Sequence, residues 1–225
     1  MGTLTLVRHG QASFGAEDYD QLSPLGRRQC LRLGQYFAAH GLRFDAVLTG
    51  TLRRHRQSYE GIAEGLGGAQ GLPPPQVLPG LDEYDAEALV RAVHPGPLPR
   101  PDTPEAVRRH FRLLRDGLLA WMDGSAAPAG MPSCEAFADG VRQALAQARS
   151  LHHGQVLIVS SGGPISVAVG QVLELAPRAL VELNLRLRNS ALTEFSASSQ
   201  RHTLLSFNHL PHLATPELAD WITYA

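Results

Sequence analysis

Short apolar runs alternate along the chain with longer segments in which apolar residues recur at helical spacing. The first run, Leu4 to Val7, is followed directly by the polar residues Arg8 and His9. Such runs are typical of buried strands when polar or turn residues bound them. Strands are expected at 4–7, 44–48, 76–78, 156–159, 191–196 and 203–207.

The segments between these runs carry helix signals. Ser23 followed by Pro24 is typical of an N-cap residue with proline in the first helical position, and Gly41 is a natural end for that helix. Further helices are expected over about 52–66, 104–122 and 133–152, and from the turn at 160–164 to residue 175.

Strands that alternate with helices predict an α/β fold with a mostly parallel sheet and helices on both faces, which is a three-layer α/β/α sandwich. The length of 225 residues suits one domain, 1–225. Residues 95–132 contain many prolines around one helical segment. We therefore expect a cap insertion at about 86–132 that covers the substrate site.

Composition narrows the classes of function. The formal net charge is −1, so no overall positive field attracts nucleic acid, and no apolar stretch reaches the length of a membrane span. We expect a cytoplasmic protein whose oligomeric state the sequence leaves open. All 20 basic residues are arginine, which excludes Schiff-base and P-loop lysine chemistry. Cys30 and Cys134 form neither a disulfide framework nor a zinc motif.

Three predicted strand ends carry polar residues suited to phosphate. They are Arg8-His9-Gly10, the segment 49–54, and Ser160-Ser161-Gly162-Gly163. Ligands of open α/β sheets bind at the carboxyl ends of strands, so these residues are expected to meet. A neutral His9 can attack phosphorus, and Arg8 and Arg54 can hold the phosphoryl oxygens in bidentate fashion. The turn at Ser161 and Gly162 can add backbone donors.

These residues resemble the histidine phosphatase superfamily, also called the phosphoglycerate-mutase-like family. Its first strand ends in RHG, as in Leu6-Val7-Arg8-His9-Gly10, and its second arginine lies in a pattern like S-x-L-x-R-A-x-Q-T, which residues 49–58 match with Arg54 in the arginine place. Tyr19 to Gly26 looks like the family's entry to its first helix.

The resemblance implies a reaction and its residues. His9 becomes a phosphohistidine, and Glu83, in an L-x-E match at Leu81-Asp82-Glu83, protonates the leaving alcohol and activates water. No metal and no organic cofactor is required. The substrate is a phosphorylated small molecule or a phosphoprotein.

Two positions depart from the family pattern. The family has V-S-H-G-G after its fourth strand, and its histidine contacts the transferring phosphoryl group, whereas here Ser161 stands in that place. His55 stands where a small residue is usual. Losing a charge-assisted hydrogen bond costs roughly 1.5–3 kcal/mol, about a ten- to hundredfold loss in rate. We expect Ser161→His to leave turnover unchanged or to raise it.

Three functions remain open. Hydrolysis is favoured over a phosphoglycerate-mutase-type phosphotransferase, because the mutase motif L-x-E-R-x-Y-G is not continued after Glu83. Ser161 also keeps open a catalytically weak phosphate-binding pseudoenzyme.

Some residue assignments also have alternatives. Arg53 is the alternative to Arg54, and Glu83 could belong to an exposed acidic turn. Ser13 either touches substrate or is a plain loop serine.

Overall fold

The computed structural model describes residues 2–13, 19–68, 71–97, 103–151 and 154–224. These residues contain a six-stranded sheet in the order β3–β2–β4–β1–β5–β6. The strands are β1 (Gly2–Arg8), β2 (Ala46–Thr49), β3 (Gln76–Val77), β4 (Gln155–Ser160), β5 (Leu192–Ala197) and β6 (His202–His209). The strands β1 to β4 run parallel, whereas β5 pairs antiparallel with both β1 and β6.

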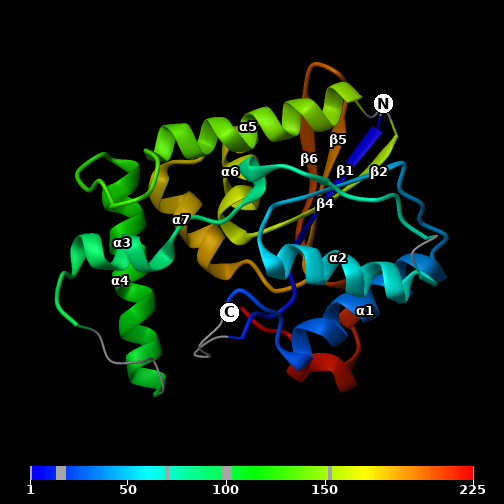
Figure 1. The fold of residues 1–225 in the computed structure, drawn as a ribbon, viewed down its shortest axis with the longest axis horizontal. Coiled ribbons are helices and arrows are strands. Elements are labelled where there is room, and N and C mark those ends of the chain that lie inside the picture. Colours follow the sequence, from blue (N-terminus) through cyan, green and yellow to red (C-terminus); the bar gives the residue numbers. More distant parts are fainter. Residues whose placement is uncertain (1, 14–18, 69–70, 98–102, 152–153, 225) are drawn as a thin grey trace.

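Helices connect the strands and flank the sheet (Figure 1). The α-helices are α1 (Pro24–Ala39), α2 (Arg53–Gly65), α3 (Ala86–Val93), α4 (Pro104–Met122), α5 (Cys134–Leu151), α6 (Gly162–Leu173) and α7 (Pro177–Arg186). Three short 3-10 helices, η1 (Pro79–Leu81), η2 (Pro211–Leu213) and η3 (Pro216–Trp221), complete the set among the described residues.

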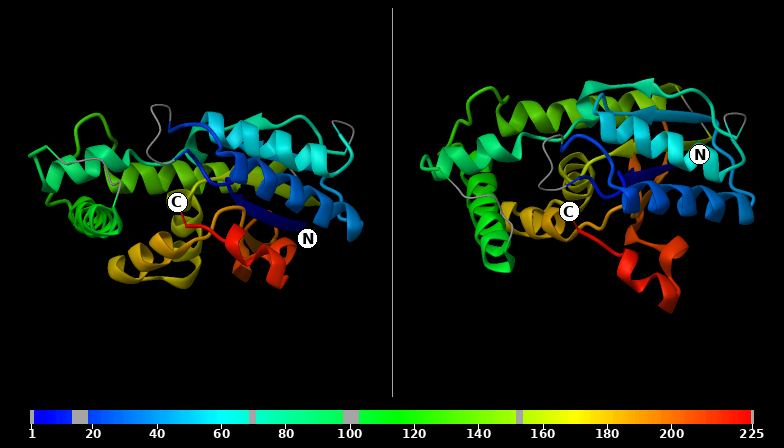
Figure 2. Two further views of the ribbon diagram at one scale, coloured as in Figure 1. Left: turned by 90° about the horizontal axis from the view of Figure 1, so that it is seen from below. Right: turned by 60° about the horizontal axis from the view of Figure 1, so that its bottom comes forward.

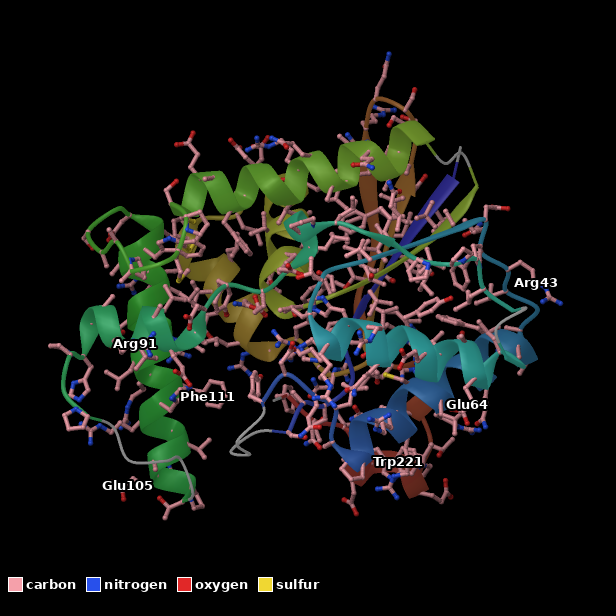
Figure 3. The ribbon with its side chains drawn as sticks, viewed as in Figure 1. Arg43, Glu64, Arg91, Glu105, Phe111 and Trp221 are labelled. Atoms are coloured by element: carbon pink, nitrogen blue, oxygen red, sulfur yellow. The ribbon has the colours of Figure 1, made fainter. Side chains whose placement is uncertain are left out.

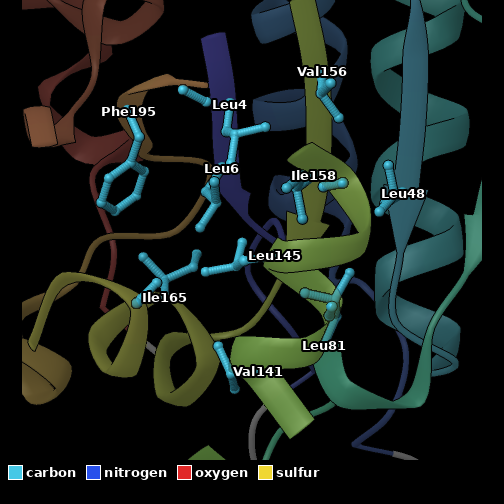
Figure 4. Close-up of a cluster of buried hydrophobic side chains, with 14 of the residues drawn as sticks. Leu4, Leu6, Leu48, Leu81, Val141, Leu145, Val156, Ile158, Ile165 and Phe195 are labelled. Atoms are coloured by element: carbon cyan, nitrogen blue, oxygen red, sulfur yellow. The ribbon is translucent and has the colours of Figure 1, made fainter. Parts of the chain in front are cut away.

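Alternation of side chains along the strands divides the core into two layers. Leu4, Leu6 and Ile158 point to the face covered by α5 and α6, where they pack with Leu145 and Ile165 (Figure 4). Their neighbours along the same strands point to the opposite face and pack against α1 and α2. Burial on both faces explains why these strands are continuous apolar runs. The predicted three-layer α/β fold is confirmed.

Local sequence explains how the first helix is positioned. The Ser23 hydroxyl accepts a hydrogen bond from the backbone N–H of Gly26 at 3.0 Å, and Pro24 occupies the first turn, as predicted. Gly41 follows the helix with φ of +63°, a conformation that favours glycine. Because α1 starts at this cap, its amino end lies beside the loop that follows β1.

Residues 86–132 differ in part from the expectation. The helix at 104–122 is confirmed as α4, but α3 precedes it and was not predicted, and residues 98–102 lie outside the described part. The two helices pack on each other and reach α7 through Val181 and α5 through Phe137. Figure 2 shows the pair at one end of the molecule, and Figure 3 shows Phe111 extending from α4 toward the body of the domain. The assignment of these residues as a cap stays a prediction.

Two further elements differ from the sequence analysis. Helix α7 was not predicted, and β5 and β6 form an antiparallel edge on the parallel sheet. Of the helices that the described residues form, none is both long and apolar enough to cross a membrane.

The crossing of α1 and α2 yields a stability prediction. A Cβ atom at Gly34 would overlap the carbonyl oxygen of Ile62 and lie 2.8 Å from the Cα atom of Gly65. We expect Gly34→Ala to lower the free energy of unfolding by about 1–3 kcal/mol through overpacking. Urea denaturation measures the change.

Gly140→Ala is the matched control. Gly140 lies within α5, and its Cβ would lie 3.6 Å from Gly80, in ordinary contact. This substitution should leave stability unchanged or raise it by up to about 1 kcal/mol. Equal stabilities of the two variants would contradict the close crossing.

Candidate active site

His9 lies at the carboxyl end of β1 with its proton in a defined place. Its backbone N–H donates to the Ser160 carbonyl at 2.8 Å, which joins the ends of β1 and β4. Its side chain is 2% exposed, and Nδ1 lies 2.7 Å from the Gly10 carbonyl oxygen. A carbonyl only accepts, so Nδ1 carries the hydrogen and Nε2 of the neutral ring is a free base.

Buried polar side chains from α1 and α2 hold the turn after His9. The Gly10 N–H donates to the Ser58 hydroxyl at 3.1 Å, and that hydroxyl donates to the Arg54 carbonyl at 2.7 Å. A Cβ at Gly10 would overlap the Gly26 carbonyl and lie 2.9 Å from Cys30 Sγ. The glycine of the RHG motif is therefore needed for this close approach to α1.

Arg54, rather than Arg53, turns into the protein. Arg54 is 6% exposed, whereas Arg53 is exposed to solvent. The Arg54 guanidinium forms an ion pair of 2.8 Å with Asp20. The same carboxylate accepts the Arg53 backbone N–H at 2.8 Å, so an anion lies at the amino end of α2.

Arg8 is partly buried and follows a different path. Its Nη1 donates to the carbonyl oxygens of Leu187 and Tyr224, the latter at 2.8 Å. Burial lowers the pKa of Arg8, while the neighbouring Tyr19 and Glu83 act in the opposite direction. An arginine starts so far above neutral pH that it stays cationic.

Glu83 reaches the amino end of α6. Its Oε1 accepts the Gly163 N–H at 3.0 Å, and a Cβ at Gly163 would overlap that oxygen. Burial raises the pKa of Glu83, and the nearby Arg54 and Arg8 oppose the rise. The residue is thus no part of an exposed acidic turn. A carboxyl group with a raised pKa suits proton donation.

Ser161 and Gly162 lie where β4 passes into α6. Both are buried, and Ser161 is 0% exposed. The Ser161 hydroxyl lies 2.7 Å from Nε2 of His55, a side chain that the sequence analysis left without a role. The signal that could have found His55 is that positions 55 and 161 depart from the family pattern together.

Ser13 lies at the edge of this arrangement. Its N–H donates to the Gln21 carbonyl at 2.8 Å, beside an isolated bridge between Ala12 and Leu22. The hydrogen bonds that join the other site residues, as far as the described chain shows them, do not involve the Ser13 side chain.

The electrostatics of the cluster favour an anion. Burial lowers the pKa of His9 well below its usual value, and Arg54, Arg8 and His55 lower it further. Two cations therefore lie near a neutral imidazole whose free nitrogen can attack an electron-poor centre. Nowhere in the described ranges do three or more His, Cys, Asp or Glu residues form a group that could hold a metal ion.

The shift of His9 can be measured directly. A lowered pKa means that His9 stays neutral as the pH falls through 6.5, the ordinary value for histidine. We expect its ring nitrogens to show no titration near that pH in nitrogen-detected NMR spectra. A His9 titration at the ordinary value would contradict the buried, cation-flanked site.

Comparison with solved structures shows the same fold. Phosphoserine phosphatase from Entamoeba histolytica has a TM-score of 0.65 at 20% identity, covering 95% of this chain and 100% of that one. Mycobacterial glucosyl-3-phosphoglycerate phosphatase has a TM-score of 0.63 at 21% identity, and the match covers 92% of this chain and 99% of that one. Bacillus stearothermophilus YhfR has a TM-score of 0.67 at 18% identity, and the match covers 94% of this chain and 99% of that one.

Sequence comparisons place the chain in a family. No curated protein sequence gave a significant match. The family model described as histidine phosphatase superfamily (branch 1) matches residues 4–210, nearly the whole chain. The chain belongs to the histidine phosphatase superfamily, branch 1.

Proposed function

We propose that the protein is a phosphatase that hydrolyses a phosphomonoester through a phosphohistidine intermediate on His9. The observation that carries this proposal is the His9 ring, which is neutral, with its hydrogen held on Nδ1 by the Gly10 carbonyl. Arg8, Arg54 and Glu83 lie close enough to act electrostatically on it or on one another. These are the parts that phosphoryl transfer to an enzyme nucleophile needs.

In the first step, the Nε2 lone pair of His9 attacks phosphorus and the bond to the ester oxygen breaks. Arg8 and Arg54 bind the phosphoryl oxygens, whose charge their guanidinium groups stabilise. Protonated Glu83 gives its proton to the leaving oxygen, so an alcohol departs. Arg54 already binds a carboxylate, that of Asp20, which supports its capacity to bind an oxyanion.

In the second step, the Glu83 carboxylate removes a proton from water as the water oxygen attacks phosphorus. The bond between Nε2 and phosphorus breaks, inorganic phosphate leaves, and both residues return to their starting states. The raised pKa of Glu83 allows it to serve as acid and then as base near neutral pH.

Hydrolysis fits better than phosphoryl transfer to a second alcohol. The mutase motif is not continued after Glu83, and Tyr84 there packs inward against Trp121 and Phe137. Several solved relatives of the same fold are phosphatases. We propose a phosphorylated small molecule or a phosphoprotein as the substrate, with no metal or organic cofactor. Ser13 and Gly162 are proposed to line its binding site, and helices α3 and α4 to select it.

The nucleophile is tested by His9→Ala. Without Nε2 no phosphoenzyme forms, so hydrolysis of p-nitrophenyl phosphate should fall to background between pH 5 and 8. His202→Ala is the control, because His202 pairs with Ala197 at the opposite end of the sheet. A His9→Ala protein that retains its turnover would refute the proposal. No turnover from the unmodified protein would favour the pseudoenzyme.

The acid is tested by Glu83→Gln. We expect kcat/KM, which reports formation of the phosphoenzyme and not its hydrolysis, to fall by about 10²–10⁴-fold with an alkyl phosphate, whose leaving group needs a proton. The loss should be much smaller with p-nitrophenyl phosphate, because nitrophenolate leaves readily. In the unmodified protein, alkyl phosphate hydrolysis should decline as the pH rises through the raised pKa of Glu83. Equal losses with both substrates would argue against an acid role.

A further inference from the structure

A second buried imidazole lies beside His9. His55 is 0% exposed, and its ring centroid lies 5.8 Å from that of His9. Its Nε2 lies 2.7 Å from the Ser161 hydroxyl, in the turn that follows β4. The first turn of α2 thus places Arg54 and His55 side by side in the protein interior.

The other side of the His55 ring faces a carboxylate. Its Nδ1 lies 3.7 Å from Oδ1 of Asp82, too far for a hydrogen bond, and is buried without a hydrogen-bond partner. Asp82 is held in place by the backbone N–H and the hydroxyl of Thr51, each at 2.5 Å. A Cβ at Gly50 would overlap both the Nδ1 and the Oδ1 atoms, so glycine keeps this approach open.

The donors and acceptors of Asp82, His55 and Ser161 determine where the hydrogens between them lie. Burial, aided by Arg54, lowers the pKa of His55 to about 3, so the ring is neutral before an anion binds. The Asp82 carboxylate, 3.7 Å from Nδ1, makes no hydrogen bond to it, but its negative charge favours the tautomer with hydrogen on Nδ1. Nε2 then accepts the Ser161 hydroxyl hydrogen. In this state Ser161 has no hydrogen left to donate to a phosphoryl oxygen.

We infer that His55 is a positioning residue for phosphoryl transfer that acts through Ser161 and is oriented by Asp82. When the phosphoryl group binds as a dianion, His55 takes up one proton, and its Nε2–H donates to Ser161 Oγ. The Ser161 hydroxyl hydrogen then turns to a phosphoryl oxygen. This inference rests on the proposed phosphatase function.

The charges around His55 are consistent with this proton uptake. The charged and titratable groups near the ring are Arg54, His9 and Asp82. Before binding, Arg54 and burial oppose a positive ring. A bound dianion offsets the charge of Arg54, and the imidazolium is then flanked by two anionic groups. The proton comes from a monoanionic ester or from solvent.

The contact also explains the two departures from the family pattern as one change. An imidazole that the family places at 161 comes here from position 55, and its contact with phosphate passes through a hydroxyl. The expectation that Ser161→His alone preserves turnover needs revision, because Ser161 is fully buried against the His55 ring. A histidine at 161 needs a small residue at 55.

The test is a double-mutant cycle of His55→Ala, Ser161→Ala and both together. Each single change should lower kcat with p-nitrophenyl phosphate by about 10- to 100-fold, the value of a charge-assisted hydrogen bond. The double change should lose no more than either single change, because the pair acts as a unit. His55→Ala combined with Ser161→His should recover most of the loss.

Proton uptake separates this role from simple packing. Inorganic phosphate binding is measured by calorimetry in buffers of different ionisation enthalpy at about pH 6, where protonation of His55 needs a smaller rise in its pKa than at higher pH. When both proteins bind the dianion, the unmodified protein should hold one proton more than the His55→Ala variant. His212→Ala is the matched control, since His212 is also buried and lies 2.9 Å from a serine hydroxyl, that of Ser190. It should retain both the proton uptake and most of kcat.

Three results would overturn the inference. The losses of the two single variants could multiply in the double variant, kcat could be unchanged in His55→Ala, or proton uptake could be the same in the unmodified protein and in His55→Ala. Failure of the proposed function looks different, because the unmodified protein would then show no His9-dependent turnover. In that case phosphate affinity in the same variants still decides whether His55 and Ser161 act together.

Discussion

Positive charge held near a neutral imidazole is the condition on which this site depends. Arg54 is buried, Arg8 is partly buried, and both lower the pKa of His9. Desolvation of cations is costly unless partners compensate; here the Asp20 carboxylate pairs with Arg54, and backbone carbonyl oxygens accept hydrogen bonds from Arg8. The arrangement keeps His9, the proposed nucleophile, unprotonated and leaves cationic groups that a phosphoryl dianion can satisfy. The same burial suits Glu83 to its proposed role as acid, because it raises the pKa of Glu83.

The parallel part of the sheet makes this arrangement possible. Strands β1, β4 and β2 end at one edge of the sheet. There the Gly50 N–H donates to the Val159 carbonyl at 3.3 Å, next to the backbone hydrogen bond from His9 to Ser160. Strand β3 extends the edge and η1 then delivers Asp82 and Glu83 to it. Three segments far apart in sequence, Arg8-His9, Arg54-His55 and Glu83, therefore meet at one place.

Features that depend on neighbouring residues could be predicted from the sequence, whereas features that depend on tertiary contacts could not. The Ser23 cap, the bounds of α4 and the buried strands follow from turn chemistry and apolar runs. Helices α3 and α7 were missed because helices of 8 and 10 residues repeat their apolar pattern over only about two to three turns. The direction of β5 was not predicted because strand pairing, rather than composition, sets it. The gathering of site residues at the strand ends was expected. The contact between His55 and Ser161 could not be predicted, because it joins residues 106 positions apart and depends on how α2 packs against the turn after β4.

The role of His9 is tested most directly by trapping the phosphoenzyme and locating its phosphate. Rapid acid-free quenching after mixing with p-nitrophenyl phosphate, whose leaving group needs no proton, followed by peptide mass spectrometry, reports the modified residue. We expect an acid-labile phosphate on His9, bonded through Nε2, because Nδ1 is held by Gly10. Phosphate on Ser161 would contradict the role of His9. So would turnover without accumulation of a phosphoenzyme in the Glu83→Gln variant, in which hydrolysis of the phosphoenzyme is slowed.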